Sequence, residues 1–271
     1  MDSQNTAVSD HSSERGVPGR RFAEYRGRYR HARLTREEGI LEITLHSDGG
    51  PLVWGDSPHT ELGYLFADVA ADPENRVVIL GGAGDAFCVK LDSSWVGRMT
   101  PEKWQKIFFH GQRLLLNLLD IEVPVVSVVN GPARVHAEIP LLGDVVVGTR
   151  DAHLQDSPHF RYGAVPGDGV HIVWQELLGP NRGRAFVLLA DRIPADEAQR
   201  LGLYHSLADD AAGAWSAARE IARDLASKPT TVLRYTRFAL TRRLRRELAD
   251  GLSYGLALEG LGGFESWPTG E

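Results

Sequence analysis

One segment of this chain carries histidine and aspartate side chains at a spacing that suits acid–base catalysis. His159 and Asp168 are nine residues apart, across a stretch broken by glycines and a proline. A carboxylate that folds back onto an imidazole orients the ring and stabilises its protonated form, so this pair predicts a general base active near neutral pH. The same spacing fits an Asp168 that caps a helix starting at Gly169, beside an ordinary loop histidine. The spacing alone leaves both interpretations open.

Three further residues are candidates for the wall of a binding site. His136 follows an expected buried strand and the Asn130-Gly131-Pro132 turn, where side chains often project into a cleft. A hydrogen-bonded histidine in the core is the alternative. His59 and Trp54 precede or begin an expected helix, so each could face a ligand or could simply support the fold.

Other kinds of chemistry find little support in the residue spacing. The histidines lack the paired helical spacing of a catalytic zinc site, so we expect no metal and no cofactor. The Gly81-Gly82-Ala83-Gly84 run is not followed by Gly-Lys-Ser/Thr, which predicts a tight turn instead of a phosphate loop. Cys88 is the single cysteine and lies in an apolar run, which predicts a buried, unreactive thiol.

The composition restricts the classes of protein to which the chain can belong. Its 271 residues, 42% hydrophobic and 24% charged, are enough to fold around a substantial core. A formal net charge of −6 repels a phosphate backbone, so we expect no nucleic-acid partner. The sequence has no membrane-spanning apolar stretch and no apolar signal region, and its cysteine content fits a reducing compartment. We therefore expect a cytoplasmic protein with no membrane partner.

The elements that must position these side chains follow from the hydrophobic pattern. Short β-branched runs alternate with helical stretches, which predicts an α/β fold. Continuous Val and Ile residues without polar alternation indicate strands buried on both faces. We expect such strands at 41–46, 77–80, 123–129 and 144–148. Helices are expected after the Pro58-His59 turn and from Pro101 to Leu119.

The C-terminal part of the chain has a different pattern. Five leucines recur every four residues, at Leu240, Leu244, Leu248, Leu252 and Leu256. This period drifts by about 40° per step against 3.6 residues per turn, so the leucines sweep around the helix and need partners on several sides. We therefore expect a disordered leader over 1–22, a core over 23–210 and a helical oligomerisation region over 211–271.

The order of several short motifs resembles the crotonase (enoyl-CoA hydratase/isomerase) superfamily over about residues 35 to 263. The resemblance implies an α/β, crotonase-like spiral core of ββα turns with a C-terminal helical trimerisation region. It also implies a homotrimer or a dimer of trimers as the assembly. The motifs that carry it are Ala86–Asp92, Val125–Gly131, Asp144–Val146, Ser157–His159 and Pro166–Gly169.

The chain departs from the hydratase pattern where that pattern defines the chemistry. Hydratases of this superfamily use glycine backbone N–H groups to form an oxyanion hole for a CoA thioester. Here Lys90 replaces one glycine, and Arg134-Val135-His136-Ala137 replaces a glycine run. One of the two hydratase glutamates aligns near Glu138, whereas the other falls on His159. A possible His/Asp base therefore stands where the hydratases have an acid pair.

With these changes the chain looks most like the 6-oxocamphor hydrolase family, whose members cleave a carbon–carbon bond in a cyclic β-diketone. The likeness rests on segments 52–54, 58–59, 138–140, 156–160, 165–169 and 181–184, and it extends through Lys228-Pro229 to Glu259. It implies that His159 and Asp168 activate water and that His136 holds a substrate carbonyl. It also implies pocket-lining roles for Trp54, His59 and Glu259.

The function expected from this resemblance is retro-Claisen hydrolysis of a cyclic β-diketone to a keto acid, with no metal and no cofactor. The expected ring system is bicyclic. Two alternatives stay open. The first is a crotonase-type hydratase or isomerase that acts on an acyl-CoA, with Glu138 as its acid/base. The second is a crotonase-like binding protein in a biosynthetic pathway that holds a carbonyl compound without hydrolysing it.

Overall fold

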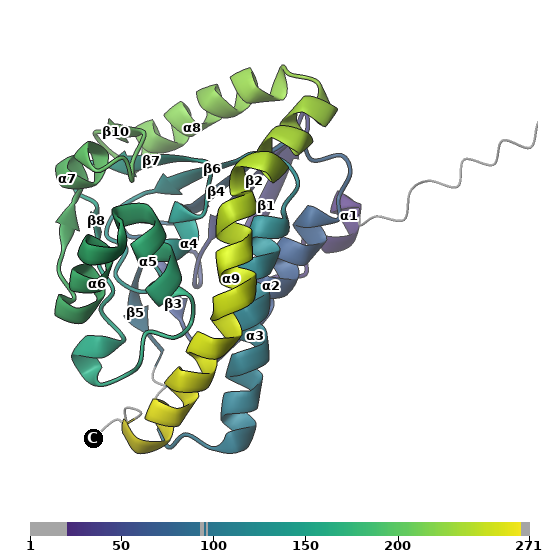
Figure 1. Cartoon of the computed structure of the whole chain (residues 1–271). Coiled ribbons are helices and arrows are strands. Elements are labelled where there is room, and N and C mark those ends of the chain that lie inside the picture. The colour runs from purple at the N-terminus through teal and green to yellow at the C-terminus, as the bar shows by residue number, and fades with distance from the viewer. Residues whose placement is uncertain (1–20, 93–94, 96, 267–271) are drawn as a thin grey trace, which may run out of the picture.

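The computed structural model describes residues 21–92, 95 and 97–266 (Figure 1). The leader expected over 1–22 lies outside these residues apart from its last two positions. Helix α1 (Phe22–Tyr25) begins at the second of them. The strands that follow are β1 (Ala32–Glu37), β2 (Ile40–Leu45), β3 (Leu52–Trp54), β4 (Val77–Gly82), β5 (Cys88–Leu91), β6 (Val125–Val129), β7 (Val145–Thr149), β8 (His153–Leu154), β9 (Ile193–Pro194) and β10 (Ser206–Ala208).

A six-stranded sheet forms the centre of the fold, in the order β1-β2-β4-β6-β7-β10. β1 and β2 form an antiparallel hairpin, and every later pair in this sheet is parallel. The strand candidates at 41–46, 77–80, 123–129 and 144–148 correspond to β2, β4, β6 and β7, each shifted by no more than two residues at an end. The α/β prediction is therefore confirmed.

Strand β4 shows why a continuous apolar run predicts a strand buried on both faces. Val77 and Ile79 pack into a cluster with helix α8, whereas Val78 and Leu80 pack into the main core on the opposite face. Successive side chains of a strand point to opposite faces, so an apolar residue is required at every position when both faces are covered. Gly81 and Gly82 continue this strand, so the tight turn predicted for residues 81–84 is wrong at its start.

Helices cover both faces of the central sheet. The helix expected after Pro58 begins earlier, at Asp56, because the missing N–H of a proline does no harm in the first turn. Among the described residues, no helix combines the length and the hydropathy needed to cross a bilayer. The helices are α2 (Asp56–Ala70), α3 (Pro101–Asp120), α4 (Glu138–Leu141), the 3-10 turn η2 (Phe160–Tyr162), α5 (Val170–Leu178), α6 (Pro180–Leu189), α7 (Ala195–Arg200), α8 (Ala211–Ala226) and α9 (Thr230–Ser266).

A smaller layer of short strands lies beside the central sheet. β3 pairs with β5 in parallel, and β8 pairs with β9 in antiparallel. Ala133 forms bridges to both Cys88 and Leu154, so the loop after β6 joins the two pairs. The Cys88 thiol is buried here, as predicted, and burial raises its pKa to about 12. This layer holds the loop that contains His136.

Helix α9 runs alongside α3 (Figure 1) and also packs against α5. Leu248, Leu252 and Leu256 are buried against the core, whereas Leu240 is 73% exposed, as the predicted sweep requires. Other large apolar side chains on α9 are also exposed, namely Val232, Tyr235, Phe238, Tyr254, Leu261 and Phe264. A second copy of the chain against this helix stays a prediction, as does the division at residue 211.

Candidate active site

The loop that follows β6 delivers His136. The side chain of Asn130 fixes the start of this loop, because it accepts the Gly82 N–H at 3.0 Å and donates to the Gly84 carbonyl at 2.9 Å. The backbone angle φ of His136 is 50°, a left-handed conformation that is uncommon for residues other than glycine. Such backbone conformations persist where the surrounding structure holds them and are concentrated at functional sites. Helix α4 starts two residues later, at Glu138.

A second irregular segment, between β8 and α5, delivers His159 and Asp168. Backbone N–H groups of Tyr162 and Ala164 donate to the His159 carbonyl, at 2.8 and 3.1 Å, which closes the loop around η2. Asp168 directly precedes Gly169, the N-cap residue of α5, and the nearby N–H of Val170 helps to lower the pKa of the Asp168 carboxyl. The N-cap of α5 is Gly169 and no side chain caps this helix, so Asp168 lies beside the helix start without acting as its cap.

These two segments meet at a cavity of about 50 Å³, which is room for a few ordered waters. The predicted site residues come together there although they are spread from residue 54 to residue 259. The cavity is lined by Trp54, His59, Leu91, Trp95, Ile107, His136, Pro158, His159, Ala164, Asp168 and Glu259.

His159 lies between two carboxylates. Its Nε2 atom is 3.3 Å from Oδ2 of Asp168, so the pair predicted from the sequence does meet. Its Nδ1 atom is 2.7 Å from Oδ1 of Asp156, a contact that is shorter and that the sequence analysis did not identify. The orienting partner of the ring is therefore Asp156 as well as Asp168, and both ring nitrogens are engaged.

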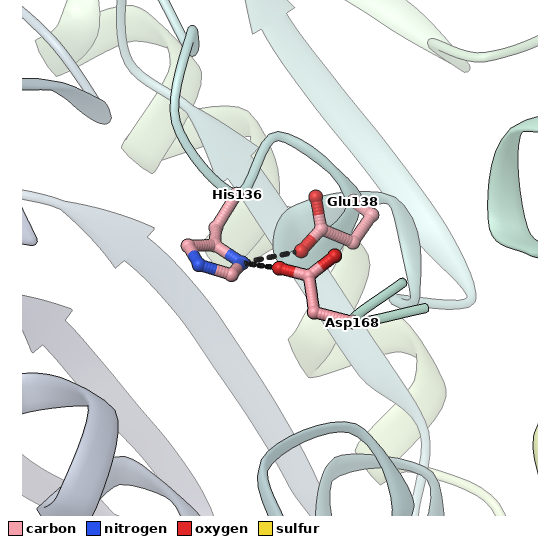
Figure 2. Close-up of side chains that lie close together, drawn as sticks. All are labelled: His136, Glu138 and Asp168. Carbon is pink, nitrogen blue, oxygen red and sulfur yellow. Dashed lines mark hydrogen bonds and ion pairs between the residues drawn. The ribbon is translucent and has the colours of Figure 1, made fainter. Parts of the chain in front are cut away.

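His136 is held in a comparable way, as Figure 2 shows. Its Nδ1 atom is 2.6 Å from Oε1 of Glu138 and 3.6 Å from Oδ2 of Asp168. The other ring nitrogen, Nε2, points away from both carboxylates (Figure 2). Because His136 lines the cavity and Glu138 does not, Nε2 is the ring nitrogen that can donate to a bound molecule.

The charges of these buried groups shift one another's pKa values. Burial opposes a charge on the His159 imidazole, yet Asp156 and Asp168 outweigh it and hold its pKa well above the ordinary 6.5. Burial likewise opposes a charge on His136, but Glu138 and Asp168 raise its pKa. The two histidines in turn outweigh burial and lower the pKa of Asp168. The resting site therefore favours charged imidazoles beside an ionised Asp168.

Glu259 reaches the cavity from α9. It lies beside the backbone of Gly167, whose N–H donates to the Val165 carbonyl at 2.8 Å. Burial, and next the nearby carboxylate of Asp168, raise the pKa of Glu259 well above its ordinary value. Two adjacent buried carboxyl groups do not both ionise readily, so Glu259 keeps its proton more easily than Asp168 does.

His59 and Trp54 form an aromatic wall of the cavity. The Trp54 ring lies 3.9 Å from the His136 ring between centroids, and the His59 ring lies 5.0 Å from that of Trp95. Burial, followed by the nearby His136, lowers the pKa of His59 to about 3. His59 is therefore neutral near pH 7. Both residues contribute to the fold and also line the cavity. A structural role and a position facing a ligand are therefore compatible for each of them.

Two groups of side chains place possible ligand atoms within 4.8 Å of one another. One consists of His136, Glu138 and Asp168, and the other consists of His159, Asp168 and Glu259. These groups come from separate loops and helices, so residue spacing does not reveal them, and the expectation of no metal stays a prediction. Asp168 belongs to both, so one ion at either group would compete with the histidine contacts described above.

Comparison with known families defines the class of protein. Residues 35–259 match the family model for enoyl-CoA hydratase/isomerase, so this chain belongs to that family. The crotonase resemblance and the crotonase-like fold predicted from the sequence are confirmed.

Individual relatives differ in their named activities. A β-diketone hydrolase from the cyanobacterium Anabaena sp. PCC 7120, solved bound to (S)-3-oxocyclohexyl acetic acid, is 42% identical, with a TM-score of 0.85 over 90% of this chain and 96% of its own. An enoyl-CoA hydratase/isomerase from Mycobacterium paratuberculosis is 26% identical, with a TM-score of 0.81 over 87% of this chain and 94% of its own. A short-chain-enoyl-CoA hydratase from Clostridium acetobutylicum is 26% identical over 82% of this chain and 85% of its own.

Proposed function

We propose that this protein is a hydrolase that cleaves a carbon–carbon bond of a bicyclic β-diketone and releases a keto acid. The observation that carries the proposal is the position of His159 and Asp168, with facing atoms 3.3 Å apart, in the wall of the cavity that His136 also lines. The likeness to a β-diketone hydrolase at 42% identity supports it. The keto acid bound to that relative is of the kind that cleavage of a bicyclic β-diketone produces.

The reaction requires a base that can take a proton from water. In the resting site the Nε2–H of charged His159 faces Oδ2 of Asp168, so the base form arises when the ring loses this proton. Neutral His159 then accepts a proton from the attacking water through Nε2, while Asp168 accepts the other O–H of that water. General-base catalysis of this kind contributes about 100- to 10,000-fold in rate. The water oxygen bonds to one carbonyl carbon, whose π electrons move to its oxygen.

Collapse of this tetrahedral oxyanion re-forms the C=O bond and breaks the bond to the central carbon. The electron pair stays on that carbon as an enolate, because the second carbonyl delocalises it. The proton held by His159 then returns to the carbon. The net reaction converts one diketone molecule and one water molecule into one keto acid, and no other co-substrate is required.

His136 supplies a hydrogen bond from Nε2 to an oxygen that gains negative charge during these steps. Its contacts with Glu138 and Asp168 favour the charged ring, which is the stronger donor. Loss of one such donor costs on the order of 3 to 4 kcal/mol of transition-state stabilisation. Trp54, His59 and Glu259 line the cavity of about 50 Å³, which must widen to admit a bicyclic diketone, and their positions then select which carbonyl is attacked.

Hydration or isomerisation of an acyl-CoA is the second candidate, because curated relatives carry such names. Two observations favour the hydrolase. Glu138, the candidate acid/base, contacts His136 and is not part of the cavity lining. The backbone N–H groups of Arg134 and Val135, where hydratases carry glycines, donate to the Cys88 carbonyl at 2.8 and 3.2 Å. They are therefore not free to bind a thioester oxygen.

The test is turnover of two substrate panels by the purified wild-type protein. One panel contains mono- and bicyclic 1,3-diketones, and the other contains enoyl-CoA thioesters. The proposal expects keto-acid formation from at least one bicyclic diketone and no hydration of the thioesters. Hydration of a thioester without diketone cleavage would establish the second candidate. A diketone that binds and is recovered unchanged would instead identify a binding protein.

A further inference from the structure

We propose that Asp156 is the positioning residue of the site, which holds Nδ1 of His159 so that Nε2 is the nitrogen presented to Asp168 and the water. The proposal rests on the proposed hydrolase function and adds a third member to its His/Asp pair. Asp156 lies in the loop that precedes η2, three residues before His159, and it is buried.

The geometry separates Asp156 from the residues that can touch substrate. Its Oδ1 atom is 2.7 Å from Nδ1 of His159, on the side of the ring opposite Asp168. His159 and Asp168 line the cavity, whereas Asp156 is not among the described residues that line it. Asp156 therefore makes its direct contact with the cavity residues through the ring of His159, and its charge also contributes to the raised pKa of Glu259.

A carboxylate at Nδ1 has two consequences for the imidazole. It keeps a proton on Nδ1 in the neutral ring, so the lone pair is on Nε2, which is the tautomer that can accept a proton from water. It also stabilises the charged ring that forms when the proton is taken up. An amide in place of the carboxylate would remove the negative charge and could donate to Nδ1, which would move the proton to Nε2.

His159 titrates within a group of charges, all of which enter the test. Asp156 and Asp168 contact the ring directly, whereas the His136 ring lies 6.4 Å away between centroids. Glu259 and His171 also interact with it electrostatically. Loss of the Asp156 charge leaves Asp168 as the one carboxylate of the described residues in contact with the ring, so the titration midpoint of His159 falls.

The experiment compares Asp156→Asn with Asp151→Asn, a change at an exposed aspartate in the same part of the chain. The first readout is a pH titration of the His159 imidazole by ¹⁵N NMR, with its signal assigned by its loss in His159→Gln. The second readout is kcat and KM for a diketone that the wild type hydrolyses. We expect a lower midpoint in Asp156→Asn, a fall in kcat of about 100-fold or more, and a KM within about threefold because Asp156 does not line the cavity.

The proposal would be overturned if Asp156→Asn left both the titration midpoint of His159 and kcat unchanged. It would also be overturned if the loss of kcat/KM in this variant came entirely from a higher KM. Asp151→Asn should match the wild type in both readouts. If Asp156→Asn does not fold, Asp156→Ser removes the same charge from a smaller side chain and is judged by the same criteria. A wild type that hydrolyses no diketone would refute the proposed function, whereas the NMR titration would still decide whether Asp156 positions His159.

Discussion

Gly167 and Gly255 pack backbone against backbone, so that a Cβ atom on either glycine would overlap the carbonyl oxygen of the other. Gly167 precedes Asp168 in its loop, and Gly255 is one turn before Glu259 on α9. This contact holds the loop against the helix and thereby brings the two carboxyl side chains to one cavity. The last helix therefore contributes to the wall of the cavity as well as to the scaffold.

Gly255→Ala tests this contact. The new methyl group would overlap the Gly167 carbonyl and the His171 ring, and we expect a destabilisation of about 1–3 kcal/mol despite the better helix propensity of alanine. The matched control is Gly251→Ala, one turn earlier, where the methyl group meets only the end of the flexible Ile172 side chain. Urea unfolding of both variants measures the difference. Equal stabilities would show that the close approach is not required.

Asp168→Asn separates the two roles of that side chain. Asparagine has almost the same shape as aspartate, and the N-cap of α5 is Gly169, so the start of α5 should be retained. The negative charge beside His159 is lost, and we expect kcat to fall by about 100-fold in a folded protein. Circular dichroism measures whether the variant is folded, and steady-state kinetics measure the fall in kcat. An unfolded variant would mean that the contribution of Asp168 to the helix start outweighs its catalytic role.

The pH dependence of kcat/KM follows from the contacts of His159. The base must be neutral, and Asp156 and Asp168 hold its pKa well above 6.5. A raised pKa means that the charged, inactive form persists to higher pH. The acid limb of the profile should therefore lie above pH 6.5, with activity increasing as pH rises through it. A limb at or below that value would exclude His159 as the group responsible. His59, with a pKa of about 3, should add no limb near neutrality.

Glu138→Gln distinguishes the hydrolase from the hydratase. In the hydrolase, Glu138 acts through His136, so the loss of its charge should weaken a hydrogen-bond donor and lower kcat by roughly 10- to 100-fold. In a hydratase the same change would remove an acid/base and abolish thioester hydration. Kinetics on both substrate panels reveal which activity is lost. Diketone turnover equal to that of the wild type would show that the His136–Glu138 contact has no catalytic effect.

The sequence predicts those parts of the structure that depend on local patterns. Valine runs in β4 and β6 identify strands buried on both faces, and the drift of the leucines in α9 predicts that they do not all face one side. The error at Gly81 and Gly82 has a related cause. Glycine weakens a strand in isolation, but here small residues are needed because Trp215 of α8 and Asn130 pack directly on them.

The site could be predicted only in part. The sequence predicts the pairing of His159 with Asp168 because a short glycine-containing loop limits how far apart they can lie. The three-residue spacing of Asp156 and His159 was also visible, but in an irregular loop this spacing fixes no contact geometry. Only the family resemblance predicts the place of Glu259 in the pocket, since its position depends on the long-range packing of α9 on the Gly167 loop.

The most direct test of the account is the turnover of a bicyclic 1,3-diketone by His159→Ala beside the wild type, at a pH above the acid limb. The account predicts a fall in kcat of about 100-fold or more, since the alanine variant has no group to accept the proton of the attacking water. Turnover by His159→Ala at the rate of the wild type would contradict it.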